Sequence, residues 1–502
     1  MEENNGLKMT HVTNLPTLNI KTQVNMPIDS NANVKQVLIV NTCLIDAQIE
    51  PSFNKATVKG KLGVKAVYLD TDNMFNTISD TVSFSEMISS ENITADCQIS
   101  ILSSQFICNF DADERSLKVY IEGSIDTFCN LSSGLNLLNQ GNEELVTKKS
   151  SLKTCSCVQQ VNKSVNYAFN FDIDCKINKI LSYDSKIVLE DCKCYDGYIV
   201  ATGDILNTIT YETNGENGCC LKMFSNTTKF KSEIEARNCD ADCFADICCY
   251  IDLSNTQITP EITENGTTFN FDYCIQVNGF IYKIINVDVV EDVYSLDSEI
   301  EIVNNKYNLC TKSPFFKTSE SVDTEITLAD EINIDEIIGL VDSSASIVQY
   351  NFKDEQLVLE GVVSGNLIYL DENKEIRHLP TQVPYTINLK QEDTDSICGT
   401  HLSIVPTNCK CKIKRGNTLM LDYEMSISGC VYHQSQVELI ENIKYGKPLN
   451  YGDIAFQIYI AHPNENKWDL CKRLHVTEDK LSSCNKDLPT TFAGGEKVIV
   501  YR

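Results

Sequence analysis

The sequence is poor in tryptophan, methionine and histidine, with one Trp, eight Met and six His in 502 residues. A core therefore has to be built from Ile, Val, Leu, Tyr and Phe, and many of these are β-branched or aromatic types that favour strands. Hydrophobic residues make up 42% and charged residues 22%, which is the composition of a folded chain rather than a disordered one. The composition predicts a mainly β protein that is long enough for three or four domains.

Positive charge is the scarcer sign, because 42 Lys and Arg face 70 Asp and Glu, for a formal net charge of −28. Such a chain repels phosphate backbones and anionic lipids, so we expect no nucleic-acid partner and no binding to a membrane surface. Two interpretations of the acidity stay open. It keeps the protein in solution, or it attracts a cationic partner.

Long apolar runs and a recognisable leader are also missing. The first twenty residues, MEENNGLKMTHVTNLPTLNI, contain no basic segment followed by an apolar one. No uninterrupted apolar stretch is long enough to cross a bilayer. We therefore expect no membrane insertion, and a protein that stays in the cytoplasm where it is made.

Metal-binding and catalytic motifs are absent although cysteine is plentiful, at 23 residues. Pairs such as Cys155/Cys157, Cys192/Cys194 and Cys409/Cys411 would share one strand face, but no Cys/His zinc spacing accompanies them. No phosphate-binding glycine loop, HExxH or GxSxG motif occurs. We predict no metal, no cofactor and no catalytic residue, and hence a protein that is not an enzyme.

What the sequence does contain is a pattern that occurs three times. In each copy a Gly is followed eight residues later by a Tyr on an alternating strand, as in Gly60/Tyr68, Gly203/Tyr211 and Gly361/Tyr369. An aromatic residue with a Cys thirteen residues after it comes next, as in Phe84/Cys97, Phe230/Cys243 and Tyr385/Cys398. Each copy closes on a strand that ends in Gly, at Gly123, Gly279 and Gly429. The copies lie 143 and 158 residues apart, which predicts three tandem β-rich, sandwich-like domains rather than a solenoid.

Two further features complete this organisation. Upstream of each Gly, apolar residues at i, i+3 and i+4 predict a short helical turn, at Val34/Val37/Leu38, Ile177/Ile180/Leu181 and Ile334/Ile337/Ile338. Polar stretches around 137–160 and 300–320 are interpreted as linkers. The predicted domains are residues 1–136, 160–288 and 318–435, followed by a small module at 453–502.

The last fifty residues predict a β-α-α-β module. The strand Phe456–Pro463 is followed by a helix with Asn466 as its N-cap, and then by a helix that opens at Thr477 and ends near Asn485. Gly494 and Gly495 precede a last strand, EKVIVYR.

This module resembles a LysM domain. The matching residues are Tyr459, Trp468, Leu470, Thr477, Leu481, Asn485 and Gly495, with the strand Val498–Val500. LysM domains bind N-acetylglucosamine polymers, and their first loop normally begins Gly-Asp-Thr. Here that loop is Asn464-Glu465-Asn466, so the backbone freedom of the Gly is lost and glycan binding is disfavoured.

A LysM-type module behind β-rich repeats, in an acidic chain, resembles the SipL family of clostridial spore coat morphogenesis proteins. The repeats match best in VLEGVVSGNLIYLDE, Val358–Glu372. The resemblance implies a scaffold without enzymatic activity that docks through its LysM module onto the ATPase coating the forespore. It also places the protein in the mother-cell cytoplasm at the forespore surface, with other coat proteins as possible partners. The alternative is a LysM-mediated binder of cortex or cell-wall peptidoglycan.

If the module binds a partner, its two loops and exposed helix faces are the expected surface. The candidate partner-binding residues are Asn464, Glu465, Asn466, Lys467, Trp468, Lys472, Arg473 and Asn485. Trp468 is also expected to help hold the core of the module, although a partly exposed Trp is a common binding anchor.

Overall fold

A computed structural model describes residues 8–28, 33–134, 145–215, 218–313, 315–391, 396–414, 417–450 and 456–501. It is mainly β, as the composition predicts, and it has two short helices near the C-terminus. Within the described ranges no helix is long and apolar enough to cross a membrane.

The strands fall into three successive sets, which we call unit 1, unit 2 and unit 3. Unit 1 comprises β1 (Lys8–Asn14), β2 (Leu18–Pro27), β3 (Val34–Ser52), β4 (Lys55–Asp70), β5 (Phe75–Ser89), β6 (Gln98–Ala112) and β7 (Ser116–Gly134). Unit 2 comprises β8 (Leu145–Ile173), β9 (Ile177–Tyr195), β10 (Tyr198–Gly215), β11 (Gly218–Glu235), β12 (Cys243–Ile251), β13 (Gln257–Ile262) and β14 (Thr267–Ser295). Unit 3 comprises β15 (Ser298–Lys312), β16 (Phe316–Thr327), β17 (Glu336–Lys353), β18 (Gln356–Leu370), β19 (Ile376–Lys390), β20 (Ile397–Lys414) and β21 (Thr418–Pro448).

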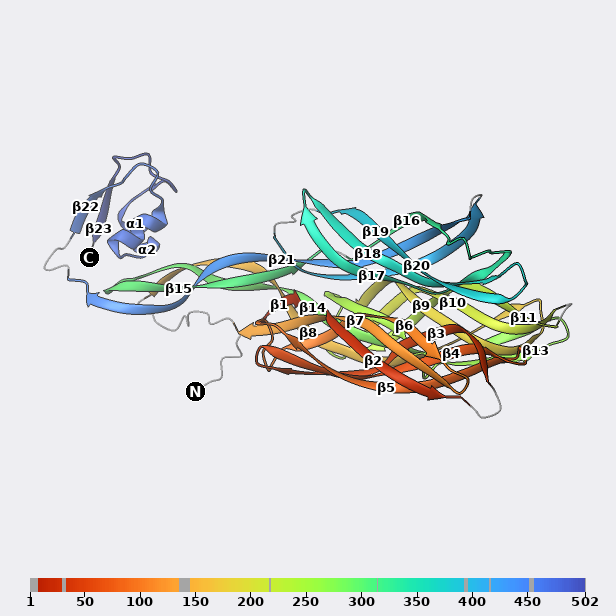
Figure 1. The fold of residues 1–502 in the computed structure, drawn as a ribbon. Helices are drawn as coiled ribbons and strands as arrows, with labels where there is room; N and C mark the ends of the chain where they lie inside the picture. The colour runs from red at the N-terminus through yellow and green to blue at the C-terminus, as the bar shows by residue number, and fades with distance from the viewer. Residues whose placement is uncertain are drawn as a thin grey trace.

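Each unit contains a three-stranded antiparallel meander and a four-stranded antiparallel sheet. The meanders are β3-β4-β5, β9-β10-β11 and β17-β18-β19, and the four-stranded sheets are centred on β7, β14 and β21. Each unit also encloses an apolar cluster built almost wholly from its own residues, between its two sheets. The units lie against one another and form the body of the molecule (Figure 1).

The Gly and the aromatic residue of each sequence pattern lie directly opposite each other on neighbouring strands. The register pairs Gly60 with Phe84, Gly203 with Phe230 and Gly361 with Tyr385. A Cβ built on any of these glycines would come within 2.7 Å of the facing ring, so the ring covers the glycine and fills the space of a side chain. The pattern thus marks a packing contact.

The predicted helical turns are wrong, because the apolar residues concerned lie at the starts of strands, apart from Ile334, which lies just before β17. In each meander the first strand carries a β-bulge that leaves one residue unpaired opposite the Tyr of the pattern. These bulged residues are Leu38, Leu181 and Ile338. A bulge breaks the period-two alternation, which explains why the spacing resembled that of a helix. The bulged side chains of all three units meet in one apolar cluster.

The stretches predicted as linkers are largely strand. Residues 145–160 belong to β8, residues 300–312 to β15, and residues 137–144 lie outside the described residues. The 29-residue strands β8 and β14 pair along their whole length, and the ends of β15 and β21 pack beside them. The four strands form an arm that extends from the body (Figure 1).

A small module lies at the tip of this arm (Figure 1). It consists of β22 (Phe456–Ile460), α1 (Lys467–Leu474), α2 (Glu478–Cys484) and β23 (Lys497–Tyr501), with β22 and β23 antiparallel. Asn466 and Thr477 cap the two helices, as predicted, by accepting hydrogen bonds from Asp469 N and Lys480 N.

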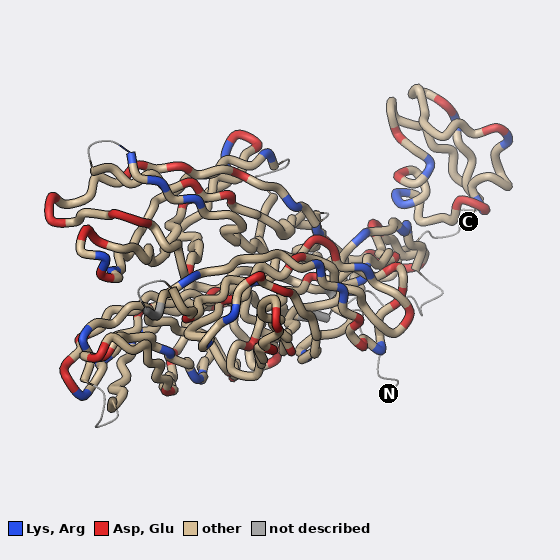
Figure 2. Tube along the Cα trace, turned by 90° about the vertical axis from the view of Figure 1, so that its right-hand side faces the viewer, with Lys and Arg blue, Asp and Glu red and all other residues tan. Residues whose placement is uncertain are grey.

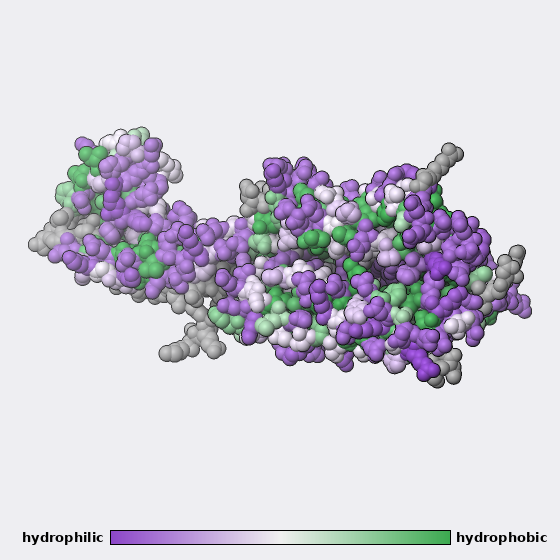
Figure 3. Space-filling model, viewed as in Figure 1, coloured by the Kyte–Doolittle hydropathy of each residue, from purple (hydrophilic) through white to green (hydrophobic). Residues whose placement is uncertain are grey.

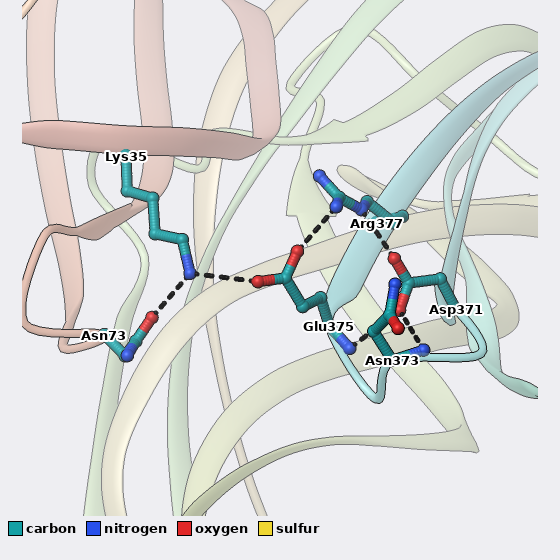
Figure 4. A network of polar contacts seen from close by, with 6 residues as sticks. All are labelled: Lys35, Asn73, Asp371, Asn373, Glu375 and Arg377. Atoms are coloured by element: carbon teal, nitrogen blue, oxygen red, sulfur yellow. Dashed lines mark hydrogen bonds and ion pairs between the residues drawn. The ribbon is translucent and has the colours of Figure 1, made fainter.

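Polar contacts also join the units at the surface. Lys35 of unit 1 forms an ion pair with Glu375 of unit 3 at 3.3 Å, and Arg377 links Glu375 to Asp371 (Figure 4). These side chains are partly exposed, so each pair contributes at most about 1 kcal/mol. The apolar cluster of bulged residues carries more of the contact between units.

Candidate functional site

The module is held to the arm by a specific set of contacts around Asp292, near the end of β14. Trp468 Nε1 donates a 2.7 Å hydrogen bond to one carboxylate oxygen of Asp292, and Lys472 Nζ lies 2.5 Å from the other. Although burial alone raises the pKa of Asp292, the hydrogen bonds from Lys472 and Trp468 outweigh it and hold the pKa below its usual value. The carboxylate is therefore ionised at neutral pH and pairs with Lys472.

Tyr294, two residues further along β14, completes the contact. Its ring packs edge-on against Trp468 with centroids 5.1 Å apart, and its hydroxyl donates to Val476 O at 2.7 Å. Tyr294 is almost fully buried and belongs to the core cluster of the module. The tip of the arm thus supplies part of the core of the module.

Most of the predicted partner-binding residues make internal contacts. Glu465 is buried, accepts a hydrogen bond from His462 N and forms an ion pair with Arg473, whose guanidinium lies 4.4 Å from the ring centre of Tyr459. Asn485 bonds both the N–H and the C=O of Ile499 and so ties α2 to β23. These contacts give the residues a structural role, and binding of a partner by them stays a prediction.

The first loop of the module has a left-handed backbone at Asn464, the position where the resemblance to LysM domains predicts a Gly. Asn464 is exposed and has φ +63°, a conformation that Asn tolerates better than most residues, and its N–H donates to Phe492 O. Lys467 occupies the first turn of α1 and Asn466 is its cap. The backbone at Asn464 therefore adopts a conformation that a Gly would also adopt readily.

The sequence reasoning missed an exposed apolar surface on the module. Phe456, Ile458 and Ile460 occupy alternate positions of β22, and their exposed fractions are 56%, 57% and 58%, respectively. Tyr501, opposite Phe456 on β23, is 53% exposed and its ring centroid lies 6.3 Å away. We call these four residues the apolar stripe, and it lies on the outer edge of the module (Figure 3). Val498 and Val500 point to the opposite face and are buried in the core of the module.

The signal for this surface is present in the alternating segment FQIYI. An alternating strand has one buried face, and the sequence alone does not say which. Because β23 contributes the buried Val498 and Val500, the three large apolar side chains of β22 are left on the outer face. An exposed apolar patch on a small module is a candidate interaction surface.

A second group of residues, whose side chains are of the types that bind metal ions, lies between units 2 and 3. Asp246, His401 and Cys430 are buried, with potential metal-ligating atoms within 4.8 Å of one another. His401 Nδ1 lies 2.5 Å from one oxygen of Asp246, and the Tyr432 hydroxyl donates to the other.

The surroundings of this group do not suit a cation. Lys312 lies nearby and donates a 3.3 Å hydrogen bond to Ala245 O, and its pKa is raised by Cys430 and Asp246 against the effect of burial. A metal ion would have to displace two hydrogen bonds and sit beside this ammonium group. The arrangement fits an internal group of hydrogen bonds from His401 and Tyr432 to Asp246 that joins two units.

Comparisons with known proteins give one positive result. No curated protein and no solved structure matches the chain. Residues 176–259, which span β9 to β12 and the start of β13 in unit 2, match the family model described as SipL, SPOCS domain. This match supports a SipL-like, sporulation-related role for the chain.

Proposed function

We propose that this protein is a scaffold without enzymatic activity that assembles the spore coat and docks through its C-terminal module onto the ATPase that coats the forespore. The observation that carries the proposal is the apolar stripe of Phe456, Ile458, Ile460 and Tyr501, which the described residues leave uncovered. Large apolar and aromatic side chains form the buried centre of protein–protein interfaces. The stripe therefore supplies the anchor that a docking module needs.

The position of the module favours the same function. The contacts of Asp292 and Tyr294 hold α1 against the arm and leave β22 on the outer side. The arm then presents the stripe away from the body, where a large partner meets no obstruction from the three units (Figures 1 and 2). Asn464 and Lys467 lie on the same module and are proposed as polar contacts at the rim.

We further propose that the module is a LysM domain and that the three units are copies of one domain. The combination of a meander with a four-stranded sheet, the three Gly–aromatic pairs and the three bulges support a common ancestor for the units. The match over unit 2 supports a spore-associated location, and we propose the mother-cell side of the forespore surface. Acidic side chains are spread over the units without gathering at one place (Figure 2).

The test is co-purification of the coat ATPase with the tagged full-length chain from sporulating cells. Ile458→Arg places a charge in the stripe and is expected to abolish recovery of the ATPase. Ile262→Arg is the matched control, because Ile262 on β13 has the same exposed fraction of 57% and lies on the body. Recovery that Ile458→Arg leaves unchanged would contradict the proposal.

A parallel sedimentation with purified peptidoglycan tests the alternative function. We expect no co-sedimentation. Binding to peptidoglycan that is lost in Asn464→Ala and kept in Ile458→Arg would favour a glycan-binding module instead.

A further inference from the structure

A large cavity lies where the three units meet. Its volume is about 1350 Å³, and its wall is formed by β3 to β6 of unit 1, β9 and the end of β12 of unit 2, and β17 to β19 of unit 3. The body is visibly hollowed between unit 3 and unit 1 (Figure 3). The volume exceeds that of a typical pocket for a drug-sized ligand, roughly 300–1,000 Å³, so a ligand larger than a single small molecule fits.

Equivalent positions of the three units place polar side chains on this wall. Asn41, Asp184 and Asp342 lie three or four residues after the bulged residues Leu38, Leu181 and Ile338 of the respective units. The bulged residues pack together in the apolar cluster, and the polar residues that follow line the cavity. The segments that carry the bulges therefore contribute both to the contact between units and to the wall of the cavity.

The charges inside the cavity compensate one another. Lys186 Nζ lies 2.8 Å from Asp184 and also donates to Ser343 O of unit 3. Burial, and next the charge of Asp184, raise the pKa of Asp342 to about 8 against the effect of Lys186, so at neutral pH this carboxyl is largely protonated. Lys65 lies 5.5 Å from the ring centre of Tyr183, and its pKa is lowered by burial. Asp80 on the same wall has the charge opposite to that of Lys65, so with Asp184 and Lys186 paired and Asp342 protonated the wall has no net formal charge to attract an anion or a metal ion.

The polar side chains of the wall can form hydrogen bonds to a ligand. Asp342 Oδ2 and Asn41 Oδ1 have no hydrogen-bond partner among the described residues, but both atoms are enclosed by their neighbours and do not face the cavity. Uncharged amide and hydroxyl side chains dominate the rest of the polar wall, among them Ser364 and Gln382.

Aromatic rings complete the lining. The ring centroids of Phe110 in unit 1 and His378 in unit 3 lie 5.6 Å apart across the junction, and Tyr183 contributes a third ring from unit 2. Flat apolar rings beside neutral hydrogen-bonding groups suit a ligand with an apolar ring face and many hydroxyls.

We propose that the cavity between the three units binds a neutral carbohydrate, with the amide and hydroxyl side chains of the wall forming hydrogen bonds to its hydroxyls. This site is separate from the module and does not rest on the proposed docking function. Because residues of all three units line it, a bound saccharide also stabilises the arrangement of the units.

The test is isothermal titration calorimetry of the full-length chain with the neutral tetrasaccharides maltotetraose, cellotetraose and chitotetraose, and with the acidic tetragalacturonate. We expect at least one neutral sugar to bind, and the acidic sugar to bind at least about tenfold more weakly. Asn41→Leu replaces an amide side chain of the wall by an apolar one and Ser364→Leu fills part of the cavity, and each is expected to weaken binding by about tenfold or more.

Asn351→Leu, on an exposed position of β17 outside the cavity, is the matched control and is expected to bind like wild type. The fluorescence of Trp468 distinguishes the two possible sites, because it responds to a sugar bound at the module and not to one in the cavity. Failure of every neutral sugar, equal binding by the acidic one, or binding that Asn41→Leu and Ser364→Leu leave unchanged would overturn the proposal.

Discussion

Trp468 and Asp292 lie 176 residues apart in the sequence and are joined by a 2.7 Å hydrogen bond from the indole N–H to the carboxylate. The same carboxylate binds Lys472, so two side chains of α1 depend on one residue of the arm. This contact fixes which side of the module faces the arm and which side faces outward.

Substituting Asp292 by Ala is expected to loosen the module from the arm. Hydrogen bonds to charged groups contribute about 1.5–3 kcal/mol, and the substitution removes two of them. Trp468 is the only tryptophan, so its emission reports this contact and is expected to shift to longer wavelength. Asp288→Ala, at an exposed position four residues earlier on β14, is the control. An unchanged emission spectrum in the Asp292 variant would show that the contact does not hold the module.

The buried pair of Asp246 and His401 is expected to stabilise the junction of units 2 and 3. Leaving a buried carboxylate without its partner costs about 3–5 kcal/mol, so His401→Ala is expected to lower the free energy of unfolding by about 3 kcal/mol. Urea denaturation measures this, with His433→Ala as a less buried control. A loss below about 1 kcal/mol would be the range of an exposed pair and would contradict this role.

The same pair predicts that the stability of the protein depends on pH in the acid range. Burial raises the pKa of Asp246, but the charges of His401 and Lys312 and the hydrogen bonds from His401 and Tyr432 outweigh it and lower the pKa below its usual value. A lowered pKa contributes stability above the unfolded value of about 4 and loses it as the pH falls below that value. The difference between wild type and Asp246→Asn is therefore expected to shrink on going from pH 6 to about pH 3. A constant difference would contradict the assignment.

The bulged residues predict that the three units depend on one another. Leu181 is fully buried in the cluster between units, and Leu181→Ala is expected to cost about 2–5 kcal/mol. Leu181→Met, which keeps the volume, is expected to cost less than about 1.5 kcal/mol. Equal losses in the two variants, measured by urea denaturation, would show that packing volume at this junction does not matter.

The carboxyl of Asp342 predicts a dependence of stability on pH that is opposite to the one predicted for Asp246. Its pKa is raised to about 8 in the folded state, so the folded state binds the proton more tightly than the unfolded one. The stabilising effect of that proton is complete below about pH 4 and is lost as the pH rises toward 8. Asp342→Asn stays uncharged, so its advantage over wild type is expected to grow between about pH 5 and pH 8. An advantage that does not change with pH would show that the carboxyl is ionised throughout.

Local features of the fold could be predicted from the sequence. The caps Asn466 and Thr477 were predicted because they depend on a few adjacent residues. The pairing of Gly60 with Phe84 left a repeated spacing, which marked the strands although not the contact between them.

Features that depend on distant strands could not be predicted in this way. The bulge at Leu38 imitates a helical spacing, because the extra residue shifts the alternation of the strand. Residues 145–160 look like a linker because one face of the arm is polar, and only the pairing of β8 with β14 makes them a strand. The exposed face of β22 is set by β23, forty residues later, and the partner of Trp468 is set by the arm.

The most direct measurement is the dissociation constant of the purified full-length chain for the purified coat ATPase. We predict saturable binding by wild type, binding at least about tenfold weaker for Ile458→Arg, and an unchanged constant for Ile262→Arg. Equal constants for all three chains, or no binding by wild type, would contradict a docking role for the apolar stripe.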